Sequence, residues 1–68
     1  MKHESFNDQG IALFNKKQFN EALIFFEKAL QLKSDFTDAI SNLGITHHRL
    51  GELDQAVRLY KQVVASDP

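Results

Sequence analysis

The residues of this chain best suited to bind a metal are its histidines and acidic residues. His47 and His48 are adjacent, Glu52 follows His48 at an i, i+4 spacing, and His3 lies far away in the sequence. Adjacent residues on a helix point about 100° apart, and Gly51 is expected to end the helix before Glu52. Because zinc requires three or four converging ligands, we predict no metal site. We assign His47 to a contact between helices and His48 to an exposed flank.

The remaining residue patterns argue against catalysis. The sequence has no nucleophile paired with a base at a recognised spacing, no glycine-rich phosphate loop and no clustered pair of carboxylates. It contains no cysteine, and its formal net charge of -1 gives no indication of a nucleic-acid partner. We therefore predict that the chain is not an enzyme and binds no cofactor.

The hydropathy of the chain indicates a folded protein outside the membrane. The hydrophobic share of 43% is ordinary for a globular chain. The apolar runs are only a few residues long, and the first four residues lack the apolar core of a signal peptide. We expect no insertion into a membrane and a cytoplasmic location.

Hydrophobic periodicity predicts an all-α fold with four helices, at residues 3–16, 21–33, 36–50 and 55–66. Asp35 is expected to cap the third helix, and Asn20 and Asp54 stand at matching places before the second and fourth. Gly51 follows the third helix, where a left-handed residue is needed. Apolar residues cover about half of the second helix, which is wider than a surface helix needs. We expect that helix to contact two neighbours.

A shift of 34 residues superimposes the pattern of the chain on itself. The identical pairs are Gly10 with Gly44, Ile11 with Ile45 and Ala22 with Ala56. At many other positions the residue class recurs, as where Phe26 falls on Tyr60. A period of this size is typical of a stacked repeat, in which each unit buries its apolar face on its neighbour.

The spaced pattern resembles the tetratricopeptide repeat (TPR) family. Its two copies read Phe6-x2-Gln9-Gly10-x2-Leu13 with Ala22-x3-Phe26, and Ile40-x2-Leu43-Gly44-x2-His47 with Ala56-x3-Tyr60. The sequence departs from the family by lacking its tryptophan at Phe6 and Ile40, its leucine at Gln9, its tyrosine at His47 and its proline at Ser34. The resemblance implies two helix-turn-helix units, at residues 3–36 and 37–68, stacked with a right-handed twist. The second unit is expected to be truncated at its C-terminal end, without a capping helix.

In TPR arrays the first helices of successive repeats line a concave groove that receives peptides or partner helices. The resemblance therefore implies a partner-binding flank on the first and third helices, composed of Asn7, Ile11, Phe14, Asn42, Ile45, His48 and Arg49. The alternative is that Ile11 and Ile45 only pack the first helices together. One subtype of the family clamps a C-terminal carboxylate with lysine and asparagine side chains. Only Asn42 matches that subtype, because Asn7 and Ile11 stand where lysine and asparagine are required, so we expect no clamp.

These observations predict a non-catalytic protein-protein interaction module that binds a peptide or partner helix. The alternative is a self-assembly element, or an excised or engineered piece of a longer array, that oligomerises through its fourth helix. We expect no following helix to cover the apolar arc of that helix, and its residues predicted to self-associate are Val57, Tyr60 and Val64.

Overall fold

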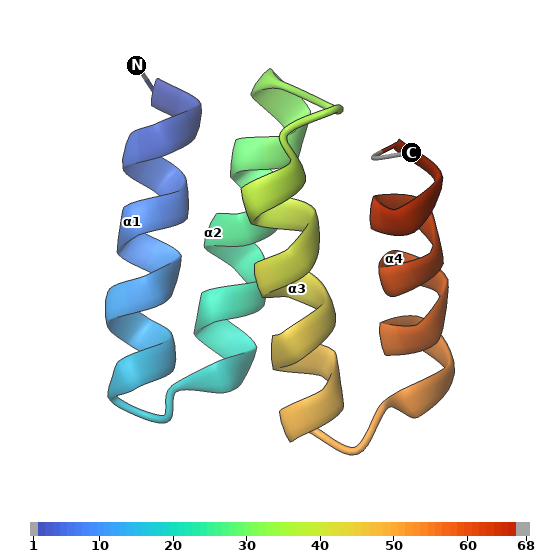
Figure 1. Ribbon diagram of the computed structural model, residues 1–68. Coiled ribbons are helices and arrows are strands. Elements are labelled where there is room, and N and C mark those ends of the chain that lie inside the picture. The colour runs from blue at the N-terminus through green and yellow to red at the C-terminus, as the bar shows by residue number, and fades with distance from the viewer. Residues whose placement is uncertain (1, 67–68) are drawn as a thin grey trace.

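The structure consists of four helices joined by short turns (Figure 1). The computed structural model describes residues 2–66, and its helices are α1 (Lys2–Asn15), α2 (Phe19–Leu32), α3 (Thr37–Arg49) and α4 (Leu53–Ser66). Consecutive helices run antiparallel, and no strand occurs among the described residues. The predicted all-α fold is confirmed, with helices close to the predicted positions. The end of the predicted second repeat, at residues 67–68, lies outside the described residues.

The first and third helices end with the same backbone motif. The N–H groups of Lys17 and Gln18 donate to carbonyls in the last turn of α1 at 2.9 Å. Those of Gly51 and Glu52 donate equivalently in α3, at 3.0 and 2.8 Å. This pair of bonds is a Schellman motif, which places a left-handed residue one position beyond the C-cap residue of the helix. The φ angle is 80° at Gly51 and 63° at Lys17, so the role predicted for Gly51 is confirmed, and Lys17 adopts the same conformation despite its side chain.

The predicted side-chain caps are wrong. Asn20 and Asp54 lie inside α2 and α4, each of which begins one residue earlier. The N-cap residue of α3 is Phe36, which makes no side-chain cap hydrogen bond, so Asp35, one residue further from the helix, does not act as the predicted cap. Packing explains the earlier start of α2, because the Phe19 ring lies edge-on to the ring of Phe14, with centroids 5.1 Å apart. This tertiary contact includes Phe19 in the helix and moves the boundary away from the polar residue.

Within each helix pair, the two helices approach each other closely at a glycine. A Cβ atom placed on Gly10 of α1 would lie 2.5 Å from the Phe26 ring of α2. A Cβ atom on Gly44 of α3 would lie 2.8 Å from the Tyr60 ring of α4. Because real Cβ contacts are not this short, each ring occupies the space that a side chain would need. Gly10 and Gly44 therefore each admit a ring of the partner helix.

The two glycines are expected to respond differently to alanine. The Phe26 ring that faces Gly10 is 1% exposed and cannot move aside, whereas the Tyr60 ring that faces Gly44 is 37% exposed and can turn outward. Alanine gains about 1 kcal/mol of helix propensity at either position. We expect Gly10→Ala to lower the free energy of unfolding by about 1–3 kcal/mol as an overpacked contact, and Gly44→Ala to change it by less than about 1 kcal/mol. Urea unfolding followed by circular dichroism measures both values, and equal losses would contradict this explanation.

The buried core lies around α2. Its centre is formed by Ala22 and Phe26 of α2 with Leu43 of α3, and half-buried side chains packed against it are Leu13, Phe14, Leu23, Leu30 and Leu59. α2 contacts both α1 and α3, which confirms the prediction that its wide apolar arc serves two neighbours. Among the described helices α4 packs only on α3, so one side of α4 has no neighbour.

Candidate functional site

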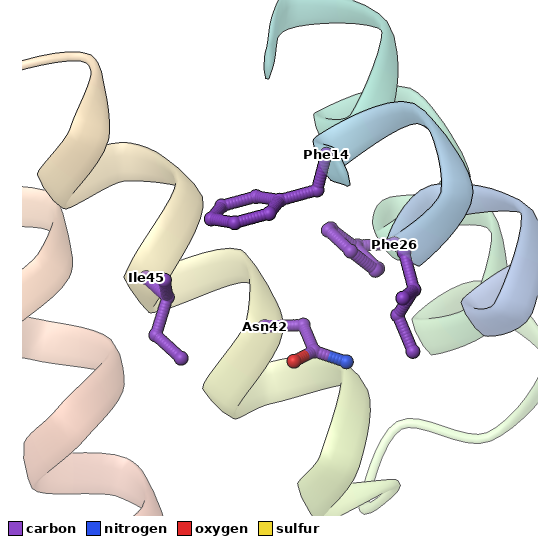
Figure 2. Close-up of a pocket in the computed structure, with 5 residues that line it drawn as sticks. Phe14, Phe26, Asn42 and Ile45 are labelled. Atoms are coloured by element: carbon purple, nitrogen blue, oxygen red, sulfur yellow. The ribbon is translucent and has the colours of Figure 1, made fainter. Parts of the chain in front are cut away.

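A small cavity lies where α1, α2 and α3 meet. Its volume is about 90 Å³, and the residues that line it are Ile11, Phe14, Phe26, Asn42 and Ile45. Figure 2 shows Asn42 and Ile45 on α3 across the cavity from Phe14 and Phe26. We refer to this cavity as the α1/α3 groove. Its walls are apolar except for Asn42, and four of its five lining residues belong to the predicted partner-binding flank.

The two isoleucines at the mouth of the α1/α3 groove are open to solvent. Ile11 is 37% exposed and Ile45 is 39% exposed. They occupy equivalent positions in α1 and α3, and Phe14, one turn after Ile11, is half-buried. If these isoleucines only packed the first helices together, their contact would close the cavity and bury both side chains. The arrangement instead leaves apolar surface available around an opening.

An amide pair joins α1 to α3 beside the cavity. The Asn42 Nδ2 group donates a hydrogen bond to Asn7 Oδ1 at 3.0 Å. Asn7, one of the residues predicted to bind a partner, is only 6% exposed. The physical reason is the close approach of the two helices, which encloses the Asn7 amide where Asn42 can bond it. Asn7 therefore acts on the groove by holding the Asn42 side chain in position.

The two remaining predicted residues lie on α3 beyond Ile45. The guanidinium carbon of Arg49 lies 5.9 Å from the centre of the Phe14 ring, a cation-π geometry that draws a positive charge to the edge of the groove. His48 is exposed, as predicted, but does not line the cavity. The structure thus connects Arg49 to the groove through Phe14 and leaves His48 on the adjoining surface.

His47 has a local structural contact that was not predicted from the sequence. Its Nδ1 atom lies 2.7 Å from Glu52 Oε1, and its side chain is 12% exposed. The Schellman turn brings Glu52 back towards the end of α3, and so pairs Glu52 with His47 rather than with His48. Within residues 2–66 no group of three or more histidine and acidic side chains is placed to hold a metal ion. The pair of His47 and Glu52 therefore serves the turn between α3 and α4.

Phe26 is the groove residue that the sequence analysis did not predict. Phe26 is buried in the core, and it also lines the cavity. The signal that could have revealed this is Gly10, next to Ile11 on α1. Without a side chain on Gly10, the Phe26 ring can lie close to the α1 backbone, where it also lines the cavity.

A second, wider depression lies on the open side of α4. Its volume is about 350 Å³, and it is lined by Val57, Tyr60, Lys61, Val64 and Ala65. We refer to these five residues as the α4 face. It contains the three residues predicted to self-associate, of which Val64 is 72% exposed. Tyr60 differs from that prediction in one respect, since its ring also packs at Gly44 and so contributes to contacts within its own helix pair.

Comparison with known proteins identifies the family. The sequence model of the tetratricopeptide repeat matches residues 13–68, and the chain belongs to the tetratricopeptide repeat family. It is 35% identical to Protein O-mannosyl-transferase Tmtc3 of Drosophila melanogaster, over 93% of this chain and 7% of that protein. It is 32% identical to Hsp70-Hsp90 organizing protein of Triticum aestivum, over 97% of this chain and 11% of that protein. The chain thus spans only a small part of these relatives.

Membership of the family defines the function at a coarse level. Tetratricopeptide repeats are protein-interaction modules that bind protein partners and are generally not catalytic, and this chain is such a module. Among the described residues, no helix is long and apolar enough to cross a bilayer. The cytoplasmic location remains a prediction.

Proposed function

We propose that the α1/α3 groove binds a peptide segment or a helix of a partner protein and encloses one aliphatic side chain of that partner. The observation that supports this most strongly is the open apolar cavity between Ile11 and Ile45, each of which is more than one-third exposed. A concave apolar site with one polar group is the usual form of a binding pocket. Covering it with a partner side chain removes apolar surface from water on both molecules.

The size of the cavity suggests which side chain enters it. An apolar cavity of about 150 Å³ is large enough to hold benzene. The volume of the α1/α3 groove is about 90 Å³, which is too small to enclose an aromatic ring and suits valine, leucine or isoleucine. The partner is therefore expected to present a branched aliphatic residue at this point.

Polar groups beside the cavity can fix the partner's orientation. An asparagine amide has two N–H donors and two acceptor lone pairs, so Asn42 can bond a peptide group of the partner while it stays bonded to Asn7. Arg49, at the edge of the groove, favours an acidic residue next to the aliphatic one. The predicted absence of a carboxylate clamp is kept in this proposal, because the buried Asn7 and the apolar Ile11 supply no cation.

We further propose that the chain has no catalytic role and binds no cofactor, so that its contribution is recognition alone. The predicted repeat boundaries remain part of this proposal. Self-association through Val57, Tyr60 and Val64 is the competing prediction. Light scattering on the chain in solution tests it, because a groove-binding module requires no defined oligomer whereas a self-assembly element does.

Selection from a random peptide library displayed on phage tests the proposal directly. Peptides that bind the chain are expected to share valine, leucine or isoleucine at one position, with an acidic residue close by. Phe26→Leu enlarges the floor of the cavity and is expected to shift the selected residue towards phenylalanine. The assignment of this cavity would be contradicted if the unaltered chain selected peptides with an aromatic residue at this position and the Phe26→Leu variant selected the same residue.

A further inference from the structure

Phe14 lines the α1/α3 groove from the last turn of α1. Its backbone is fixed, because its carbonyl oxygen accepts a hydrogen bond from the N–H group of Lys17 at 2.9 Å. Its side chain is half-buried, and Figure 2 shows the ring reaching from α1 towards α3. Rotation about the side-chain bonds is the remaining way in which this ring can leave the cavity. The groups that contact the ring therefore decide how wide the groove is.

Two residues from other helices contact the Phe14 ring. The ring of Phe19, at the start of α2, lies edge-on to it, with centroids 5.1 Å apart and planes at 67°, which is a favourable aromatic geometry. The guanidinium carbon of Arg49, at the end of α3, lies 5.9 Å from its centre, within cation-π range. Neither Phe19 nor Arg49 is among the residues that line the cavity. They can therefore affect the width of the groove only through Phe14.

We propose that Phe19, together with Arg49, is a positioning residue that holds the Phe14 ring in the wall of the α1/α3 groove and so excludes aromatic side chains from it. This inference rests on the proposed function, in which the groove encloses one aliphatic side chain of a partner. With the ring in place, the cavity volume is about 90 Å³, whereas benzene fits a cavity of about 150 Å³. A Phe14 ring that turned outward would free the space of an aromatic ring.

A second aromatic pair of the same helices provides a matched control. Phe25 of α2 lies next to Phe6 of α1, with ring centroids 6.3 Å apart. Phe19 and Phe25 are both half-buried, but Phe6 does not line the cavity. Phe25→Leu thus removes a ring from the same helix as Phe19→Leu does, without releasing a residue of the groove.

The preference between two peptides tests the positioning role. The peptides are one library-selected sequence with leucine at the enclosed position and the same sequence with phenylalanine there. Calorimetry is expected to show that the unaltered chain prefers leucine and that Phe19→Leu reduces this preference about fivefold, the size of a lost aromatic pair. Phe25→Leu, and Phe19→Tyr, which keeps the ring, are expected to retain the preference. A general loss of stability would weaken both peptides alike and leave their ratio unchanged.

Arg49→Met is a milder variant that tests the second contact. Arg49 is exposed, so its replacement does not endanger the core. We expect the preference for leucine to fall in the same direction as with Phe19→Leu, because the Phe14 ring loses one of its two contacts.

The free chain offers a readout that requires no peptide. Ile11 and Ile45 line the cavity together with Phe14, so the ring current of a fixed Phe14 ring shifts their methyl resonances. Phe19→Leu is expected to move these resonances, whereas Phe25→Leu is expected to leave them in place.

The outcomes separate this inference from the proposed function. Peptide binding that does not respond to Ile45→Lys would refute the proposed function and, with it, the role of Phe19 in selectivity. Binding that responds to Ile45→Lys, while Phe19→Leu or Arg49→Met keeps the full preference for leucine, would overturn the positioning role alone. Methyl resonances that move equally in Phe19→Leu and Phe25→Leu would also overturn it.

Discussion

Replacing Phe26 with alanine is expected to lower the free energy of unfolding by about 3–5 kcal/mol, the range observed for large-to-small changes at buried aromatic residues. Phe26 is 1% exposed, occupies the space left by Gly10 and forms the centre of the core with Ala22 and Leu43. For a chain of 68 residues, typical values per residue give a total stability of roughly 3–10 kcal/mol. Phe26→Ala would therefore remove a large part of that total, as measured by urea unfolding followed by circular dichroism.

The repeat provides a matched control for this variant. Tyr60 is the counterpart of Phe26 and faces Gly44 in the same way, but it is 37% exposed. Because the Tyr60 ring keeps much of its contact with water in the folded chain, Tyr60→Ala is expected to lower the free energy of unfolding clearly less than Phe26→Ala. Equal losses for the two variants would show that the core is not centred on α2.

Replacing Ile45 with lysine is expected to weaken the binding of a library-selected peptide about a hundredfold. Removing a buried isoleucine contact reduces the free energy of binding by about 1.5–3 kcal/mol. Enclosing the lysine ammonium in an apolar cavity would weaken binding further. A hundredfold change corresponds to about 2.7 kcal/mol. Isothermal titration calorimetry measures the affinity, while the stability of the free chain is expected to change little because Ile45 is 39% exposed.

Ile24→Lys is the control for this substitution. Ile24 lies on α2, is 51% exposed and is not among the residues that line the groove. The same change of side chain at this position is expected to leave the affinity for the peptide unaltered. If Ile24→Lys weakened binding as much as Ile45→Lys, the effect would come from added positive charge rather than from the groove.

The sequence was sufficient to predict the fold because the decisive residues act over short distances. Gly10 and Gly44, which are 34 residues apart, are each needed where the two helices of one pair touch. Gly51 is needed where α3 ends. Apolar residues of α2 recur at helical spacing over half its surface, so its two neighbours could be expected from that helix alone. These features depend on local sterics and periodicity, which are visible without coordinates.

The parts that could not be predicted depend on contacts between distant segments. The start of α2 moved to Phe19 because its ring meets Phe14, which overrides the capping preference of Asn20. Asn7 was predicted to contact a partner, whereas its burial and its bond to Asn42 depend on how closely α1 approaches α3. The positions of Ile11, Phe14 and Ile45 followed from family resemblance, whereas their arrangement around a cavity required the structure.

Mapping of backbone amide resonances during titration with a library-selected peptide tests the central proposal most directly. We expect the peptide to shift the resonances of residues around the α1/α3 groove, namely Ile11, Phe14, Asn42, Ile45 and Arg49. The resonances of exposed residues elsewhere on α2 and α4, namely Glu27, Gln31, Lys61 and Gln62, are expected to stay in place. Shifts that cluster on this second set while the groove resonances remain unmoved would contradict the proposed binding site.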